Sequence, residues 1–171
     1  MPGSHWMIAL SPENFEATRA HGFTVQGVKN RHRKKAERMA PGDRILFYVT
    51  GIQVFPATAT VTSGYFEDQS PIWQSPERRA DHFPWRVRIK PDCVLDPHEY
   101  IDARLLAPRL LYVKRWAPED WALAFQGNVH LLSAADFSLV DNEIQRILRA
   151  RGQRKEQIPE RVRAREGQHV G

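Results

Sequence analysis

An amide and a dense group of cations lie close together near the start of the chain. Asn30 carries a donor and an acceptor on one side chain, which suits the edge of a nucleobase. The surrounding segment 29–38 is strongly basic, and Lys and Arg that approach phosphates release condensed counterions. These residues predict a nucleic-acid or nucleotide site. The alternatives are a helix N-cap for Asn30 and a solvated helix face for the cations.

The rest of the chain offers no recognisable catalytic motif. Cys93 is the single cysteine, which excludes an internal disulfide and a cysteine-based metal cluster. The seven His residues show no metal-binding spacing, and neither a phosphate-binding glycine loop nor a nucleophile elbow is present. We therefore expect a binding protein without a cofactor or metal. The alternative is an enzyme acting on nucleotides or nucleic acid, with Asp43 or Asp81 as general base.

Length and composition indicate one domain. The 171 residues carry a net charge of +5, which favours a polyanionic partner. We expect one domain over residues 1–151 and a basic, flexible tail over 152–171, which has few apolar residues. No signal peptide and no apolar run long enough for a membrane span is seen, which predicts a cytoplasmic protein without a membrane partner.

The hydrophobic patterns predict strands separated by short helices. Residues 44–50 are apolar on both faces, so this strand should be covered on both sides. The strand 85–90 alternates apolar with basic residues and should have a cationic outer face. Further strands are expected over 5–10, 23–25, 53–65, 93–95 and 128–132. Helices are expected over 12–20, 30–39, 118–125 and 134–151.

Two turns should position the candidate residues. Ser11-Pro12-Glu13 has the composition of a helix N-terminus. Pro41-Gly42-Asp43 is a tight turn that begins the buried strand. Between the strands, residues 66–84 form a long polar loop of the kind that often carries function. The pattern lacks the regular alternation of a doubly wound sheet. It predicts an α+β fold, a small β-barrel or curled mixed sheet of five to six strands flanked by short helices.

The ordered set of local sequences resembles the EVE domain, a relative of the YTH and PUA families. Its carriers are Trp6 with Ser11-Pro12, Gly27-Val-Lys-Asn30, Pro41-Gly-Asp with Leu46-Phe-Tyr48, Trp85-Arg-Val and His130-Leu-Leu-Ser133. The resemblance covers about residues 5–150 and implies a PUA-like fold. It also implies a pocket for a base, often a modified one, in DNA or RNA. Lys29 stands where many EVE domains have Arg, a departure that bears on which base is read.

The resemblance also implies where pocket groups lie. It places Leu10 and Ser11 at the pocket after the first strand, and Trp73 on the loop that carries a cage aromatic in YTH domains. A core role for Trp85 and capping roles for Ser11 and Ser133 are the alternatives. The expected base-binding residues are Leu10, Ser11, Val28, Lys29, Asn30, Tyr48, Trp73, Phe83, Trp85 and Ser133.

Phosphate contacts are expected from two basic strips, on the helix 30–39 and on the strand 85–90. The expected residues are Arg31, Arg33, Lys34, Lys35, Arg86 and Arg88. A third interpretation is a protein whose basic surface binds RNA or an acidic partner by shape alone, without reading a base.

Overall fold

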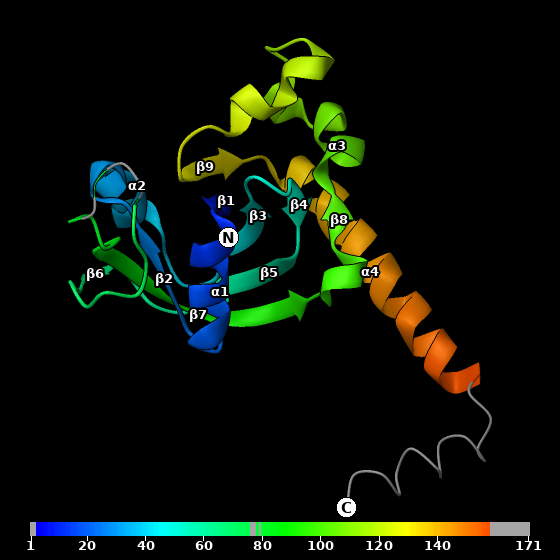
Figure 1. Cartoon of the computed structure of the whole chain (residues 1–171), viewed down its shortest axis with the longest axis horizontal. Coiled ribbons are helices and arrows are strands. Elements are labelled where there is room, and N and C mark those ends of the chain that lie inside the picture. Colours follow the sequence, from blue (N-terminus) through cyan, green and yellow to red (C-terminus); the bar gives the residue numbers. More distant parts are fainter. Residues whose placement is uncertain (1–2, 76–77, 79, 158–171) are drawn as a thin grey trace, which may run out of the picture.

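The structure is a computed structural model that describes residues 3–75, 78 and 80–157. A curled sheet occupies its centre, with α2 at one side and the long helix α4 at the other (Figure 1). Helix α1 crosses the sheet, and a series of short helical turns lies beyond the strand β9.

Across the described residues, six strands follow one another in the order β2-β7-β5-β3-β1-β9. Strands β1 and β3 are parallel, and the other neighbours along this path are antiparallel. This arrangement confirms the predicted curled mixed sheet of five to six strands. The strands are β1 (His5–Leu10), β2 (Val25–Val28), β3 (Arg44–Val49), β5 (Ala57–Val61), β7 (Trp85–Val94) and β9 (Val129–Leu132). Short strands extend it: β4 (Val54–Phe55), β6 (Phe66–Glu67) and β8 (Ile101–Asp102).

Strand β7 joins two segments that the sequence predicts as separate strands. Its pairing with β5 shifts register between Thr58 and Ala59, whose partners are Cys93 and Pro91. The skipped residue, Asp92, is the extra residue of a β-bulge. The bulge lets the strand continue past a proline, which lacks a backbone donor.

Short helices connect and flank the strands. Ser11 Oγ accepts the Asn14 N–H at 3.1 Å and caps α1, as predicted. The predicted helix 30–39 is a 3₁₀ turn followed by α2, and α4 continues beyond residue 151. The helices are α1 (Pro12–Ala20), α2 (Arg33–Arg38), α3 (Ala103–Leu106) and α4 (Ala134–Gln157), with 3₁₀ turns η1 (Asn30–His32), η2 (Pro97–Glu99), η3 (Ala107–Arg109), η4 (Leu111–Val113) and η5 (Pro118–Phe125). Most of the predicted tail, residues 158–171, lies outside the described residues.

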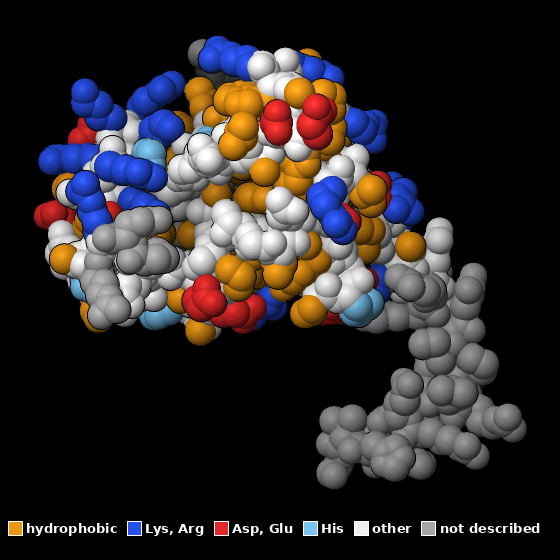
Figure 2. Space-filling view, turned by 45° about the horizontal axis from the view of Figure 1, so that its top comes forward, with side chains coloured by type: hydrophobic (Ala, Val, Ile, Leu, Met, Phe, Trp, Pro, Cys, Tyr) orange, Lys and Arg blue, Asp and Glu red, His pale blue; other side chains and the backbone are white. Residues whose placement is uncertain are grey.

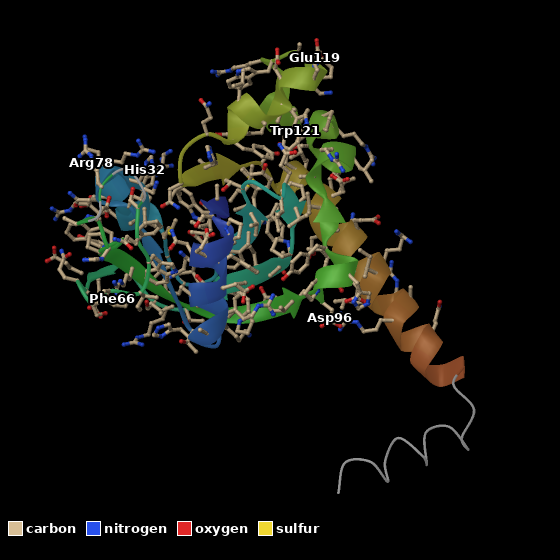
Figure 3. All side chains as sticks on the ribbon, in the orientation of Figure 1. His32, Phe66, Arg78, Asp96, Glu119 and Trp121 are labelled. Carbon is tan, nitrogen blue, oxygen red and sulfur yellow. The ribbon has the colours of Figure 1, made fainter. Side chains whose placement is uncertain are left out.

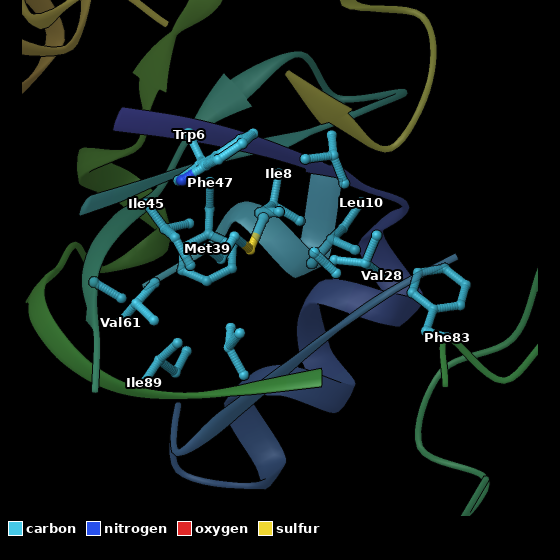
Figure 4. Close-up of a cluster of buried hydrophobic side chains, with 14 of the residues drawn as sticks. Trp6, Ile8, Leu10, Val28, Met39, Ile45, Phe47, Val61, Phe83 and Ile89 are labelled. Carbon is cyan, nitrogen blue, oxygen red and sulfur yellow. The ribbon is translucent and has the colours of Figure 1, made fainter. Parts of the chain in front are cut away.

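Hydrophobic cores cover both faces of the sheet. One cluster, which includes Trp6, Ile8 and Phe47, fills the space that the curled sheet encloses (Figure 4). The other includes Leu46 and Tyr48 and packs against η5 and α4. Successive β3 residues thus enter different cores, which confirms that this strand is covered on both faces. None of the described helices is both long and apolar enough to span a membrane.

Asp43 connects the start of the chain to the turn before β3. Only 4% of this residue is exposed. Its carboxyl oxygens accept the Ser4 N–H at 2.9 Å, the Trp6 Nε1–H at 2.9 Å and the Ala40 N–H at 3.1 Å. The predicted turn residue therefore also satisfies the indole of Trp6, which would otherwise be a buried donor without a partner.

We expect Asp43→Ala to lower the free energy of unfolding by about 3 kcal/mol, because it leaves buried donors unsatisfied. Urea denaturation measures the change. As a control, Glu37→Ala removes an exposed carboxylate that pairs with Arg33 and should change stability by less than about 0.5 kcal/mol. Equal effects of the two substitutions would contradict this role of Asp43.

Candidate functional site

A pocket of about 380 Å³ opens where β1 and β3 end. The two strands are parallel and in register from His5 and Arg44 to Leu10 and Val49. Their carboxyl ends therefore meet at the same edge of the sheet, where ligands often bind in sheets with parallel strands. Residues 9–11 continue from β1 into the pocket wall, and Tyr48, Thr50, Gly51 and Gln53 line it from β3 and the following turn.

Helical turn η5 and the segment after it form another wall of the pocket. Ala122 and Phe125 come from η5, and residues 126–128 follow it. Gly127 has φ +94°, a conformation that favours glycine. The turn it makes brings Asn128 against the ends of β1 and β2.

Asn128 holds three parts of this site together, and only 2% of it is exposed. Its Nδ2 donates to the Ala9 carbonyl at 3.0 Å, and its Oδ1 accepts the Lys29 N–H at 3.1 Å. Its own carbonyl accepts the Ala9 N–H at 2.8 Å. Asn128 is not among the residues predicted from the sequence, although Gly127-Asn128 before a strand signals a turn.

Aromatic side chains give the pocket apolar surfaces. Tyr48 and Phe125 contact each other with ring centroids 4.9 Å apart, and Phe83 lines the pocket from the other side. Burial raises the pKa of Tyr48 to about 12, so its hydroxyl stays protonated near neutral pH. The pocket can therefore hold a flat ring and donate a hydrogen bond to an acceptor atom on it.

Cations form the rim of the pocket. Lys29 and Arg31 both line it, and the Lys29 ammonium lies 5.8 Å from the centroid of the Phe83 ring. Figure 2 shows Lys and Arg side chains gathered over η1 and α2. Among the described residues that line this pocket, none carries a carboxylate. The site therefore favours a ligand with negative charge or with hydrogen-bond acceptors.

The predicted base-binding residues divide between the pocket and other parts of the fold. Five of them line the pocket: Leu10, Ser11, Lys29, Tyr48 and Phe83. Val28 is buried in the core beneath it. Ser133 accepts the Asp136 N–H at 3.1 Å and caps α4 instead.

Trp73 lies in the core behind Phe83, with 1% of the residue exposed. Its indole stacks on Phe83, with centroids 6.1 Å apart and planes at 25°. Its Nε1–H donates to Thr18 Oγ1 at 2.9 Å. The indole thus supports the pocket wall from behind, whereas the resemblance places a cage aromatic on this loop.

Asn30 and Trp85 contact each other instead of the pocket. The Asn30 Oδ1 accepts the Trp85 Nε1–H at 2.9 Å, and the Arg33 guanidinium lies 4.3 Å from the centroid of the Trp85 ring. Asn30 therefore does not cap the following helix through its side chain. It faces a second hollow of about 620 Å³, which shares Lys29 and Arg31 with the pocket and is also lined by Arg78 and Asp81.

The predicted phosphate-binding cations divide into exposed and structural groups. Arg31, Arg33 and Lys34 are exposed on η1 and α2. The Lys35 ammonium, in contrast, donates to the Val129 carbonyl at 2.8 Å and joins α2 to β9. Arg88 is exposed on β7 and lies 5.3 Å from the centroid of the Phe66 ring.

Arg86 is buried, with 1% exposed. Its guanidinium donates to the Phe83 carbonyl at 3.1 Å and to Ser70 Oγ at 2.7 Å, and it lies 5.0 Å from the centroid of the Trp73 ring. The expected outward cation is therefore enclosed, because residues 66–75 fold over this end of β7. In this conformation Arg86 cannot contact a phosphate in solution.

Two histidines lie behind the basic rim. The His130 Nδ1 meets the Tyr112 hydroxyl at 2.7 Å, and its Nε2 meets the Gly127 carbonyl at 3.1 Å. Burial lowers the pKa of His130. Burial, followed by the charge of Lys35, lowers the pKa of His32 to about 4. Figure 3 labels His32 at the end of the molecule that carries α2. Both imidazoles are therefore neutral near pH 7, and His130 fixes the Gly127 turn.

A group of possible metal ligands lies outside the residues that line the pocket. Asp96, His98 and Glu99 bring ligand atoms within 4.8 Å of one another. However, Arg151 already forms an ion pair with the Glu99 carboxylate, whose pKa it lowers to about 2. We assign no metal to this group.

Comparisons with known proteins place this architecture in a family. The sequence profile of the EVE domain matches residues 4–110, so the chain belongs to the EVE domain family. UPF0310 protein PH1033 of Pyrococcus horikoshii is 26% identical over 148 residues, which cover 81% of this chain and 97% of that protein. The resemblance inferred from the sequence is confirmed.

The fold is shared with YTH domains. The Pho92 YTH domain in complex with m6A has a TM-score of 0.59 at 12% identity, with 84% of each chain covered. The YTH domain of the MRB1 protein of Zygosaccharomyces rouxii, in complex with N6-methyladenosine RNA, has a TM-score of 0.56 at 14% identity. There the alignment covers 81% of this chain and 85% of that one.

Gly27 allows the loop that carries Trp73 and Phe83 to approach β2. A Cβ at this position would lie 2.5 Å from the Phe83 carbonyl oxygen and 2.6 Å from Trp73 Cζ3. We expect Gly27→Ala to displace Phe83 from the pocket wall and to lower the free energy of unfolding by about 2 kcal/mol. Chemical denaturation measures the loss.

Gly64→Ala is the matched control for this prediction. No described atom lies within 4 Å of a Cβ at Gly64, so its effect should stay within about 0.5 kcal/mol. If Gly27→Ala were as mild as the control, the close approach of the loop to β2 would not constrain the site.

Proposed function

We propose that this chain binds nucleic acid and holds one unstacked, modified base in the pocket at the ends of β1 and β3. The observation that carries the proposal is the composition of that pocket. Aromatic surfaces lie inside, Lys29 and Arg31 form the rim, and none of the described lining residues has a carboxylate. A base needs stacking surfaces and a few fixed hydrogen-bonding groups, and its flanking phosphates need cations.

The dimensions of the site support this function. A volume of about 380 Å³ lies within the roughly 300–1,000 Å³ that is usual for small-ligand sites. Arg31, Arg33 and Lys34 are exposed beside it on η1 and α2, where they would contact the strand on either side of the extruded base. The two YTH domains that share the fold are described as complexes with m6A and with N6-methyladenosine RNA.

The same geometry favours binding over catalysis. Asp43 is occupied by the Trp6 indole and by backbone donors. Asp81 accepts the backbone N–H groups of Asn30 and Phe83. Both candidate general bases therefore have structural partners, and neither lines the pocket. We accordingly propose a reader of a base and not an enzyme that alters it.

The test is fluorescence anisotropy at fixed moderate salt. The panel consists of matched single- and double-stranded DNA and RNA oligonucleotides that carry cytosine, 5-methylcytosine, 5-hydroxymethylcytosine, adenine or N6-methyladenine. We expect one modified base to bind at least about tenfold more tightly than its unmodified parent, a difference of about 1.4 kcal/mol. Equal affinities with a common salt dependence would support binding by shape and charge alone.

Ala122→Phe tests whether the pocket is responsible for this preference. Ala122 lines the pocket, so a phenyl group there should fill it and abolish the preference while leaving general, salt-dependent affinity. The neighbouring Leu123 is 47% exposed, and Leu123→Phe should leave both unchanged. A preference that survives in Ala122→Phe would place base recognition elsewhere.

A further inference from the structure

Tyr48 has an unusual position in the pocket wall. The residue is 3% exposed, and its ring is enclosed by Phe55, Trp121 and Phe125 at centroid distances of 5.6, 6.3 and 4.9 Å. These aromatic contacts fix the ring between β3 and η5. The side chain that reaches the pocket is therefore rigid, which limits the entropy lost when a ligand contacts it.

The hydroxyl of Tyr48 has no hydrogen-bond partner in the part of the chain that the structure describes. Buried tyrosine hydroxyls usually have one. Two other tyrosines of this chain follow that rule, since the Tyr100 hydroxyl accepts from Arg19 at 2.5 Å and the Tyr112 hydroxyl meets His130 at 2.7 Å. Tyr48 is thus a buried residue with an unused donor.

This hydroxyl is accessible from the pocket. The fully enclosed side-chain polar atoms that lack a partner, among the described residues, are Thr58 Oγ1, His82 Nδ1 and Asp141 Oδ1. The Tyr48 oxygen is not one of them, and Tyr48 lines the pocket. An accessible oxygen on an otherwise enclosed ring offers one directed hydrogen bond to whatever occupies the pocket.

We propose that the Tyr48 hydroxyl determines specificity by donating a hydrogen bond to an acceptor atom on the edge of the bound base. This inference rests on the proposed function and narrows the ligand class. The base must be uncharged and must present a ring nitrogen or a carbonyl oxygen to β3. Bases that carry a positive charge are disfavoured, because Lys29 and Arg31 form the rim and no described lining residue supplies a carboxylate.

The hydroxyl can keep this role over a wide pH range. Burial raises the pKa of Tyr48 to about 12, so the phenol remains a donor throughout the range in which nucleic acids are stable. A neutral phenol also cannot balance the positive charge of a cationic base, whereas a carboxylate would.

Tyr48→Phe tests the inference by removing one oxygen atom while keeping the ring. Binding of the preferred oligonucleotide from the panel should weaken about tenfold, with the unfolding temperature nearly unchanged. Tyr65→Phe is the control, because Tyr65 is 40% exposed and lies beside Trp85. Binding of the preferred oligonucleotide by Tyr48→Phe within twofold of the parent protein would overturn the inference while leaving the proposed function intact.

Changes in the base itself test the same hydrogen bond without relying on the variant's folding. Each ring nitrogen is replaced by C–H, and each carbonyl oxygen by hydrogen, one at a time. One replacement should weaken binding by the parent protein about tenfold. The same replacement should not weaken binding by Tyr48→Phe any further, which indicates that the two groups are coupled. Losses that are additive for every acceptor would overturn the inference.

Charged bases provide the last arm of the experiment. N3-methylcytosine and 5-methylcytosine are isomers, of which the first is cationic near pH 7, and N1-methyladenine and N6-methyladenine form a similar pair. The parent protein should bind the cationic member of each pair no better than an unmodified base. Preference for a cationic base would overturn the inference but support a base reader, whereas no preference in the whole panel would overturn the proposed function as well.

Discussion

The pocket depends on one buried amide. Asn128 accepts from the Lys29 backbone, donates to the Ala9 carbonyl and pairs through its own carbonyl with the Ala9 N–H. These bonds join the end of β1, the start of the basic rim and the loop after η5, which are far apart in sequence. The Ala9 carbonyl, the Ala9 N–H and the Lys29 N–H thereby have hydrogen-bond partners. The relative position of the apolar wall and the cations is therefore set by a side chain that is itself 2% exposed.

The basic residues of this protein have two different roles. Arg86 donates to the Phe83 carbonyl inside the fold, and Lys35 donates to the Val129 carbonyl between α2 and β9. Arg31 and Lys34 remain exposed beside the pocket. The net charge of +5 therefore overstates the positive charge that a polyanion can contact at this site, because some of the basic side chains bind backbone carbonyls instead. Arg31, Arg33 and Lys34 are exposed on η1 and α2, where Figure 2 shows Lys and Arg side chains gathered.

Local patterns predicted much of the fold. The apolar run of β3, the cap at Ser11 and the turn at Asp43 depend on neighbouring residues, and the structure has all three. The curled sheet followed from the element pattern and from the ordered motifs together. Of the predicted base-binding residues, five line the pocket: Leu10, Ser11, Lys29, Tyr48 and Phe83.

The remaining site residues depend on contacts that are distant in sequence. Alternation along β7 predicted that Arg86 faces outward, but a strand's pattern does not show that residues 66–75 will cover it. The resemblance implied a cage aromatic at Trp73, yet its indole donates to Thr18 and lies beside Gly27. Asn128 forms hydrogen bonds with Lys29 and Ala9, which lie 99 and 119 positions before it in the sequence. Single-sequence periodicity contains no information about such partners.

Base binding in this pocket is tested most directly by an NMR titration of the isotopically labelled full chain with the oligonucleotide that it binds best. We expect the backbone amides of Leu10, Gly51, Gly127 and Asn128 to shift with the modified base. The unmodified oligonucleotide should shift chiefly amides of η1 and α2. If the modified base perturbs only the basic surface and leaves the four pocket amides unchanged, the pocket at the ends of β1 and β3 is not where this protein reads its ligand.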